Sequence, residues 1–297
     1  MTKLGSMTRR NVKLFFKDKG MFFTSLVTPI ILLVLYATFL GNIYRDSFTS
    51  GLPEGIVFSE KLIEGLVAGQ LMSSILAVSC VTVAFCSNFL MVQDKANGVI
   101  KDLRITPIKS STLSLSYYIA TLISTLLICV VATGVCLVYV AIAGWFMTFV
   151  DVLLLFLDVL ILVLFGTALS SVVNFFLSSQ GQISAVSSII TAGYGFICGA
   201  YMPISSFSAG LQKVVSFLPG TYGTSLIRTH SLNGVFNEMQ AQGLPAEAVE
   251  GIKASLDCSL EFFGNKVEVL SMYLILAGTI TVLIGAYILM NKLKKKR

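Results

Sequence analysis

The sequence carries little charge for its length. Asp, Glu, Lys and Arg together make up 12% of the 297 residues, whereas a soluble domain carries about 25%. So little charge cannot cover a water-exposed surface, and hydrophobic residues make up 55% of the chain. The composition therefore excludes a soluble globular domain and predicts a protein whose surface is largely covered by lipid.

The sequence also lacks the motifs of an enzyme or a metal protein. It contains no GxxxxGK[ST] loop for nucleotides, no GxSxG, HExxH or CxxC motif, and no cluster of Cys and His. The single histidine, His230, has no evident Ser or Cys partner. Five of the six cysteines lie inside apolar runs and act as small hydrophobes. We therefore expect neither catalysis nor a metal nor a cofactor in this chain.

Apolar runs, by contrast, are long and numerous. Each is long enough to cross a bilayer of ~30 Å as a helix at 1.5 Å per residue. The polar break at 178–182 predicts a tight turn between the fourth and fifth spans. The fold class is an all-α membrane protein, a single transmembrane domain over residues 1–297. Its six spans are expected at about 21–41, 65–92, 113–143, 151–177, 183–202 and 268–290.

Basic residues lie mostly on one side of these spans. Of the 21 Lys and Arg residues, 15 lie in the two terminal segments and in the loop 93–111. Because Lys and Arg concentrate on the cytoplasmic side, both termini are expected in the cytoplasm. An even number of spans agrees with this topology. The expected location is a bacterial cytoplasmic (inner or plasma) membrane.

The segment 8–20, ahead of the first span, has the spacing of an amphipathic helix. Basic residues repeat every four positions on one face, and Val12, Phe15 and Phe16 form another face. Such a helix lies in the membrane interface, either as a passive anchor or as a docking element for a partner. The candidate residues of this elbow helix are Arg9, Arg10, Lys13, Lys17 and Asp18.

The loop 93–111 is the only sizeable cytoplasmic loop expected. Val99 and Leu103 share one face of a short helix there, and Pro107 ends it. A short amphipathic helix between two spans can insert into a groove of a partner. It can equally rest on lipid.

Within this loop the sequence resembles the ABC type-2 exporter permease family. Members carry an acidic stretch, a Gly, a Leu five residues later and then Thr-Pro, which Gly98, Leu103, Thr106 and Pro107 match; the acidic residues are reduced here to Asp94. Lys17-Asp18 is similar to the Arg-Asp that ends the elbow helix of the family. The segment 203–228 is similar to the pair of short re-entrant helices between its fifth and sixth spans. The resemblance runs from about residue 8 to residue 290.

The resemblance implies a permease subunit of an ATP-driven exporter. ATP and Mg would be bound by separate ABC ATPase subunits, and the partners would be those subunits, a second permease copy or a related permease, and membrane lipid, without nucleic acid. The loop helix would then be the coupling helix that receives the motion of the ATPases. Its candidate residues are Asp94, Gly98, Leu103, Arg104, Thr106 and Pro107.

Asp158 is a carboxylate inside the fourth span. It lies seven residues after Asp151 on the same helical face, about 10 Å deeper in the membrane. A carboxylate at that depth faces protein or a wet cavity, so it either lines a translocation path or bonds to a neighbouring span. The same two interpretations apply to Gln70, Asn88 and Asn174.

Gly195 and Gly199 form a GxxxG spacing in the fifth span, which lets helix backbones approach closely. In the family, permeases pair near the first and fifth spans, so these glycines are candidate dimer contacts. The outward region 203–266 ends in an extra piece, 229–266, that is either a cap over the exit or a surface loop.

The substrate is less determined than the class of protein. Family cargoes include hydrophobic drugs, peptides and lipid-linked glycans, and the outward insertion with one Trp favours a hydrophobic drug or an amphipathic peptide. The alternative is an exporter of a lipid-linked glycan or teichoic-acid type polymer. A membrane-embedded sensor or enzyme subunit without transport is the alternative of another class, and an ATPase gene beside this one would argue against it.

Overall fold

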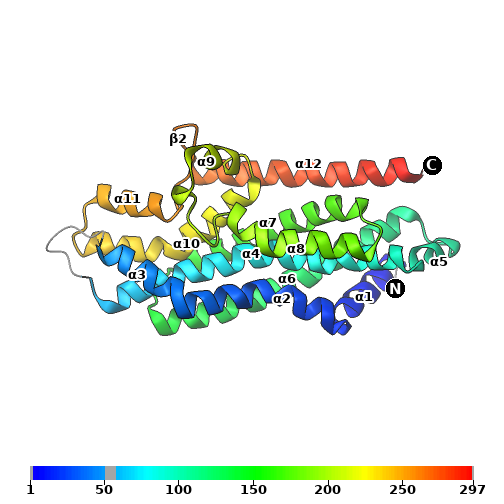
Figure 1. Cartoon of the computed structure of the whole chain (residues 1–297), viewed down its shortest axis with the longest axis horizontal. Helices are drawn as coiled ribbons and strands as arrows, with labels where there is room; N and C mark the ends of the chain where they lie inside the picture. Colours follow the sequence, from blue (N-terminus) through cyan, green and yellow to red (C-terminus); the bar gives the residue numbers. More distant parts are fainter. Residues whose placement is uncertain (1–2, 51–57, 296–297) are drawn as a thin grey trace.

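The computed structural model describes residues 3–50 and 58–295 as an elongated bundle of helices (Figure 1). Both ends of the described chain lie at one end of the bundle, together with α5 (Val99–Ile105). At the opposite end lie α3 (Gly41–Ser50) and α11 (Ala246–Ser255). We call these two ends the α5 end and the α11 end.

The centre of the bundle is α4 (Glu60–Ala96). Its most apolar stretch is entirely buried, and a helix that is apolar all round belongs inside a protein or a bilayer. Its 37 residues make it about 55 Å long, so it extends beyond the hydrocarbon of a bilayer. The helices that pack against α4 are α2 (Lys19–Leu35), α6 (Ser110–Ala143), α7 (Phe149–Phe176), α8 (Gln180–Ile197) and α10 (Pro219–Ala241).

The last helix, α12 (Val269–Lys295), lies outside this ring and packs mainly on α7 and α10. It continues past the predicted end of the sixth span at residue 290. The first span also runs further than predicted. α2 passes through a π-helical turn, η1 (Tyr36–Leu40), into α3, so one apolar helix covers Lys19–Asp46.

Capping residues set the starts of several helices. Thr148 and Asp151 form a capping box at the start of α7, and Ser179 and Gln182 form another at the start of α8. The polar break at 178–182 is therefore the tight turn that the sequence predicts. Asp18 accepts a hydrogen bond from the backbone of Met21 at 3.0 Å and so begins α2.

This cap divides the predicted segment 8–20. The amphipathic helix α1 (Lys3–Lys17) starts earlier than predicted and ends one residue before Asp18. Residues 19 and 20 belong to α2 instead. The boundary moves because the Asp18 side chain, and not the polarity of the segment, decides where the second helix begins.

The region between α8 and α12 holds the remaining elements. The sequence predicts two short re-entrant helices here. α9 is short, whereas α10 has 23 residues and reaches the α11 end. The second helix is therefore longer than predicted. α11 begins directly after Pro245. The other elements are η2 (Ile204–Ser206), α9 (Ala209–Val215), and the antiparallel strands β1 (Glu261–Phe262) and β2 (Asn265–Lys266).

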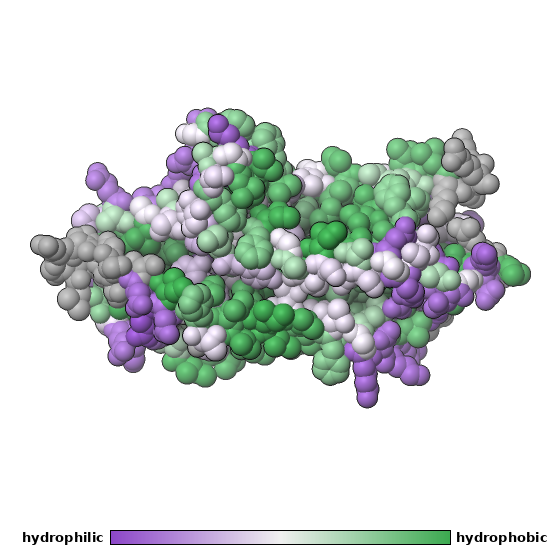
Figure 2. All heavy atoms as spheres, in the orientation of Figure 1, coloured by the Kyte–Doolittle hydropathy of each residue, from purple (hydrophilic) through white to green (hydrophobic). Residues whose placement is uncertain are grey.

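Five helices of the described residues are long and apolar enough to cross a membrane. Four of them, the helix over Lys19–Asp46 and α4, α6 and α7, correspond to the first four predicted spans, and the other, α12, corresponds to the predicted sixth span. α8, the predicted fifth span, is not among them. The sequence of α8 is rich in Gln, Ser and Thr, which lowers its hydropathy. Figure 2 shows hydrophobic residues over the middle of one face and hydrophilic residues towards both ends, as expected of a protein that crosses a bilayer.

Candidate functional site

α5 is held in a fixed loop at the α5 end. Gly98 precedes it with a φ of 80°, a left-handed conformation that favours glycine. Thr106 is extended and its hydroxyl donates to the carbonyl of Leu103 at 2.5 Å. Lys3 of α1 donates to the carbonyl of Pro107 at 2.9 Å. The matched residues thus shape both ends of the short helix.

The two faces of α5 differ in burial. Ile100 and Leu103 pack against the core of the bundle, whereas the side chain of Ile105 is 86% exposed. Two residues advance a helix by about 200°, so Ile105 points away from the face of Leu103. Ile105 is not among the residues predicted from the sequence, although an Ile out of phase with the buried positions of a helix is a signal of an exposed apolar side chain. The side chain of Arg104, a predicted coupling residue, lies outside what the structure describes.

Asp94 lies beneath this helix, buried at the end of α4. Its Oδ2 accepts from Arg10 Nη1 at 2.8 Å and from the hydroxyl of Tyr117 at 2.5 Å. Beside it, Asn11 Nδ2 donates to Ser116 Oγ at 3.3 Å. These bonds join α1, α4 and α6. Asp94, predicted to act towards a partner, therefore faces inward and fastens α1 to the end of α4, just before α5.

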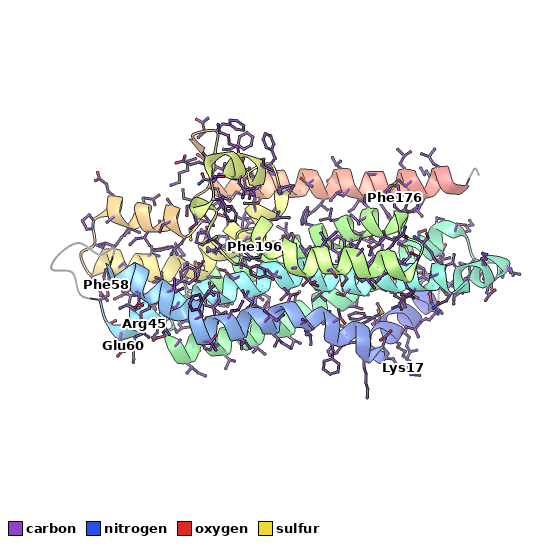
Figure 3. The ribbon with its side chains drawn as sticks, viewed as in Figure 1. Lys17, Arg45, Phe58, Glu60, Phe176 and Phe196 are labelled. Carbon is purple, nitrogen blue, oxygen red and sulfur yellow. The ribbon has the colours of Figure 1, made fainter. Side chains whose placement is uncertain are left out.

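On α1, Arg9, Lys13 and Lys17 are exposed, and their placement in a membrane interface stays a prediction. Figure 3 shows Lys17 pointing away from the bundle. The predicted apolar face of α1 is not buried as a whole. Phe15 is buried against the bundle, whereas Phe16 is partly exposed. Arg10 does not join the exposed stripe but turns inward to Asp94.

Lys95, the neighbour of Asp94, binds the end of a different helix. Its Nζ donates to the carbonyls of Asn174, Phe175 and Leu177 at 2.9–3.1 Å. The last carbonyls of a helix have no partner within it and favour a cation. Lys95 therefore caps α7. This role is not evident from the sequence, because Lys95 and the carbonyls that it binds are 79 to 82 residues apart in the chain.

Asp158 joins three helices in the interior. Its Oδ2 lies 2.6 Å from Nδ1 of His230 in α10, and its Oδ1 accepts from the hydroxyl of Tyr273 in α12. Asp151, on the same face of α7, accepts from Asn233 Nδ2 at 2.8 Å. Of the two interpretations that the sequence leaves open, this geometry favours bonds to neighbouring helices. It also supplies His230 with a partner that the sequence did not reveal.

The other polar candidates are as deeply buried. Asn88 of α4 donates to Ser170 and Ser171 of α7 at 3.2 and 2.9 Å. The side chains of Gln70 and Asn174 make no hydrogen bond to a described residue. All three are at most 2% exposed. The described chain encloses these side chains and that of Asp158. Their role in lining a translocation path stays a prediction.

A large groove runs along the outside of the bundle between α2 and α8. It encloses about 860 Å³, and its walls are apolar, with Val27, Ile31 and Phe39 on one side and Ala192 and Phe196 on the other. Figure 3 shows Phe196 on α8 in the middle of the bundle. The groove therefore has the size and the lining of a site for an apolar molecule or helix.

The two predicted dimer glycines lie near one end of this groove and serve the chain itself. A Cβ at Gly195 would come within 2.3 Å of the ring of Tyr201. Gly199 has a φ of 74° at the end of α8, and its carbonyl accepts from Arg228 Nη2 at 2.9 Å. Their role as dimer contacts stays a prediction.

Arg228 of α10 is fully buried near the α11 end, where it joins the end of α8 and the segment after α11 to α10. Its Nη1 lies 3.2 Å from Asp257 Oδ2 and donates to the carbonyl of Leu256 at 3.0 Å. Asp257 in turn accepts from the backbone of Ile204 at 2.7 Å. Burial raises the pKa of Asp257, while Arg228 and the backbone bonds act in the opposite direction. The sequence analysis placed Arg228 within the family segment but gave it no role.

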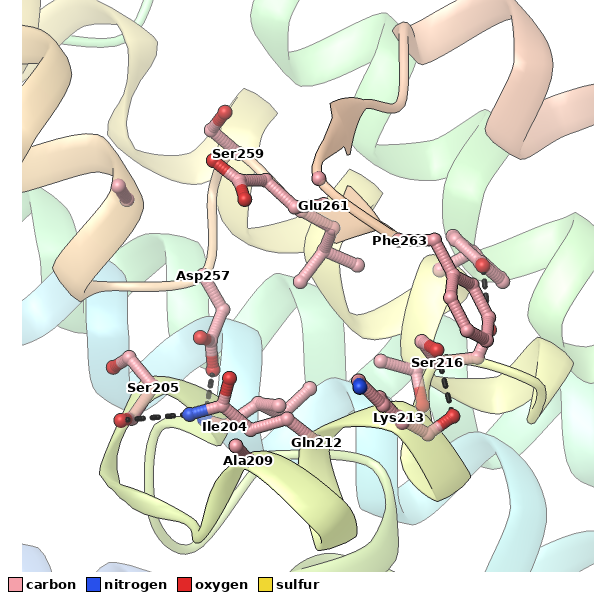
Figure 4. Close-up of a pocket in the computed structure, with 15 residues that line it drawn as sticks. Ile204, Ser205, Ala209, Gln212, Lys213, Ser216, Asp257, Ser259, Glu261 and Phe263 are labelled. Atoms are coloured by element: carbon pink, nitrogen blue, oxygen red, sulfur yellow. Dashed lines mark hydrogen bonds between the residues drawn. The ribbon is translucent and has the colours of Figure 1, made fainter.

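Above this pair lies a smaller, more polar cavity of about 350 Å³, shown in Figure 4. Lys213 of α9, Glu261 of β1 and Phe263 line it, and Lys213 Nζ lies 6.0 Å from the centre of the Phe263 ring. Ser205 lines both this cavity and the apolar groove. The two hollows therefore adjoin at η2.

Comparison with known proteins adds one finding. The family model described as ABC-2 type transporter matches residues 2–230, a range that includes α1, α5 and the α2–α8 groove. No curated protein matches the sequence.

Proposed function

This chain belongs to the ABC-2 type transporter family and is the membrane permease component of an ABC transporter, and from this premise we propose that it works in an ATP-driven exporter. ATP and Mg bind to ATPase subunits on separate chains. The permease lies in a bacterial cytoplasmic membrane with the α5 end in the cytoplasm. The excess of basic residues in the terminal segments and the loop 93–111 supports that orientation.

The observation that carries the proposal is the exposed Ile105 of α5. A large apolar side chain that neither the core nor the hydrocarbon covers favours a protein partner with an apolar pocket, the usual form of an interface anchor. Gly98 and Thr106 fix the helix on either side. α5 is therefore the coupling helix, and Ile105 is the residue that enters a groove of the ATPase.

The residues beneath α5 carry its motion into the bundle. Arg10, Asp94 and Tyr117 join three helices at this point, and α4 is buried along its apolar length. A displacement of α5 therefore moves helices as rigid bodies. Closure of the ATPase subunits on ATP shifts the permease between inward- and outward-facing states by the difference in affinity of the ATPases for the two.

A second permease copy, or a related permease, covers the groove between α2 and α8. α2 and η1 expose apolar side chains such as Phe23, Ile30 and Phe39 along their outer face. The 18 residues of α8 span about 27 Å and make the fifth of six crossings, with a hydroxyl-rich exposed face that suits a path between two subunits. The apolar walls favour a hydrophobic drug or an amphipathic peptide over a glycan, whose hydroxyl groups need polar partners.

The test of the coupling role replaces Ile105 by Ser in the full-length permease. We expect the amount of P-loop ATPase that co-purifies with the tagged permease from its host to fall at least about tenfold, as for an interface anchor. ATP-dependent export of the drug or peptide cargo falls with it.

Ile142 provides the matched control, since it is 81% exposed and lies in the last turn of α6, at the other end of the bundle. Ile142→Ser should retain both the ATPase and transport. If Ile105→Ser also retains both at the wild-type level, α5 does not couple to an ATPase. If no P-loop ATPase co-purifies with the wild type and transport proceeds without ATP, the exporter assignment itself is wrong.

A further inference from the structure

A separate cavity lies between the start of α6 and the last turns of α12. It encloses about 450 Å³, within the range of roughly 300–1,000 Å³ of small-molecule sites. Ser114 Oγ donates to Asn291 Oδ1 at 2.7 Å and closes its inner side. The rings of Tyr118 and Tyr287, whose centres are 6.1 Å apart, form one wall. The cavity therefore has a defined floor and wall and is not merely a gap between two helices.

The part of the cavity nearest the α5 end is polar and positive. Lys292 of α12 lies at this part, opposite Ser110 and Ser111 of α6. None of these three side chains has a hydrogen-bond partner among the described residues, and the hydroxyl oxygen of Tyr118 is buried without one. The lining residues include no Asp or Glu. An ammonium group and several free hydroxyl groups together suit a phosphate group.

The part further from the α5 end is apolar. On α12, Ile288 and Ile284 lie about 6 and 12 Å from Lys292 along the helix axis, and on α6, Leu115 lies about 6 Å from Ser111. All three apolar residues line the cavity, and Leu115 and Ile288 are about half exposed. Both walls thus change from polar to apolar in the same direction, towards the middle of the bilayer.

We propose that this cavity binds one anionic phospholipid of the leaflet next to the α5 end. Its phosphate lies against Lys292 and the two serine hydroxyl groups, and the first part of an acyl chain lies along Leu115 and Ile288. Charge complementarity selects an anionic headgroup, because the cavity offers a cation and no carboxylate. The inference needs only that α6 and α12 cross the membrane, and it does not depend on export or on an ATPase.

The position of the site gives the lipid a structural effect. α6 starts directly after the loop that holds α5, and Ser114–Asn291 is a bond from α6 to α12. A lipid that contacts both helices therefore strengthens the attachment of the α5 loop to the bundle.

The test titrates the delipidated, detergent-purified full-length permease with phosphatidylglycerol or phosphatidylcholine of identical acyl chains, read by native mass spectrometry. We expect one phosphatidylglycerol to bind more tightly than phosphatidylcholine. Lys292→Gln should weaken phosphatidylglycerol binding about fivefold, the contribution of one lysine at an anionic surface. Ile288→Trp fills the apolar part and should remove the bound molecule of either lipid.

Two matched variants separate this site from general lipid contact. Lys101→Gln removes an exposed lysine of α5, and Leu274→Trp enlarges an exposed residue of α12 far from the cavity, so neither should change the titration. Equal binding of the two lipids by the wild type, or equal effects of Lys292→Gln and Lys101→Gln, would overturn the proposal. Displacement of the phospholipid by millimolar inorganic phosphate alone would also overturn it, because the site would then recognise a free anion.

Discussion

The two ends of the bundle each contain an Arg–Asp pair, and the surroundings of the two pairs differ. Arg228 and Asp257 at the α11 end have almost no exposed surface, and their remaining hydrogen bonds go to backbone groups and to the hydroxyl groups of Ser73 and Ser74. At the α5 end, Arg10 keeps 31% of its side chain exposed while it bonds to Asp94. The first pair is enclosed, and the second lies at the edge of water.

This difference shows what each end is built to do. A buried pair that loses one partner leaves an uncompensated charge, so the enclosed pair strongly favours a single arrangement of η2, α10 and the segment after α11. The Arg10–Asp94 pair keeps one partner partly in water, so its separation costs less than that of the enclosed pair. The electrostatics thus fix the α11 end more strongly than the α5 end.

The strongest test of the comparison breaks the enclosed pair. Arg228→Met leaves the Asp257 carboxylate buried and unpaired, so the free energy of unfolding should fall by about 3–5 kcal/mol. Denaturation in detergent micelles measures it. The control is Arg45→Met, which removes partly exposed pairs with Glu60 and Glu64 and should cost less than about 1 kcal/mol. Equal losses in the two variants would show that Arg228 is not the enclosed anchor described above.

The second test breaks the pair at the α5 end. Asp94→Asn removes the charge that Arg10 and Tyr117 share and should cost about 1.5–3 kcal/mol, the range for hydrogen bonds to a charged group. Amide hydrogen exchange in α1 should rise in the same variant. Asp102→Asn, an exposed carboxylate of α5, should leave both measurements unchanged, and unchanged exchange in Asp94→Asn would mean that α1 is held by other contacts.

The third test concerns the cap on α7. Lys95→Met leaves the last carbonyls of α7 without their cation and should cost about 1–2 kcal/mol, as for a partly buried cation at a helix end. Hydrogen exchange should rise at the amides of the last turn of α7, and the rest of α7 should keep its protection. Lys101→Met, which removes a lysine that is exposed on α5, should have no such effect. The same exchange in both variants would contradict the cap.

The smallest effect belongs to a surface contact at the α11 end. Lys266 and Lys253 bond to Glu250 at 2.6 and 3.0 Å and lower its pKa. A lowered pKa means that the ionised carboxylate stabilises the folded form. The contribution is present above the ordinary glutamate value of 4.5 and is lost as the pH falls below it. Because Glu250 is 46% exposed, screening limits the effect to about 0.5 kcal/mol.

Hydrogen exchange of α11 and of the β1–β2 hairpin between pH 6 and pH 3 measures this loss. Glu250→Gln should remove the pH dependence, whereas Glu247→Gln, an exposed neighbour on the same helix, should retain it. A pH dependence that persists in Glu250→Gln would place its origin elsewhere at this end.

Much of the fold follows from local features of the sequence. The apolar runs predict the long helices, Ser179 with Gln182 begins α8, and Gly98 and Pro107 bracket α5. Boundaries shift where a side chain acts on the backbone, as Asp18 does at the start of α2. These features are readable because they act within a few residues along the chain.

The candidate site was predicted less completely. The sequence indicated the short helix α5 but not its exposed Ile105, because exposure depends on which face of α5 the bundle covers. It indicated Asp158 as polar and deep but not its bonds to His230 and Tyr273. It assigned Asp94 to a partner, whereas the structure turns Asp94 towards Arg10.

The sequence by itself determined that this chain is a helical membrane protein with basic termini and a short amphipathic helix after its second long apolar run. Composition, periodicity and caps are sufficient for that, since each acts through the nearest residues or the nearest solvent. The tertiary structure alone decided which charged side chains meet, because Arg228 and Asp257 are 29 residues apart in the chain and Arg10 and Asp94 are 84 residues apart. Only the packing of helices side by side fixes such pairs, and with them which end of the molecule the electrostatics fix more strongly.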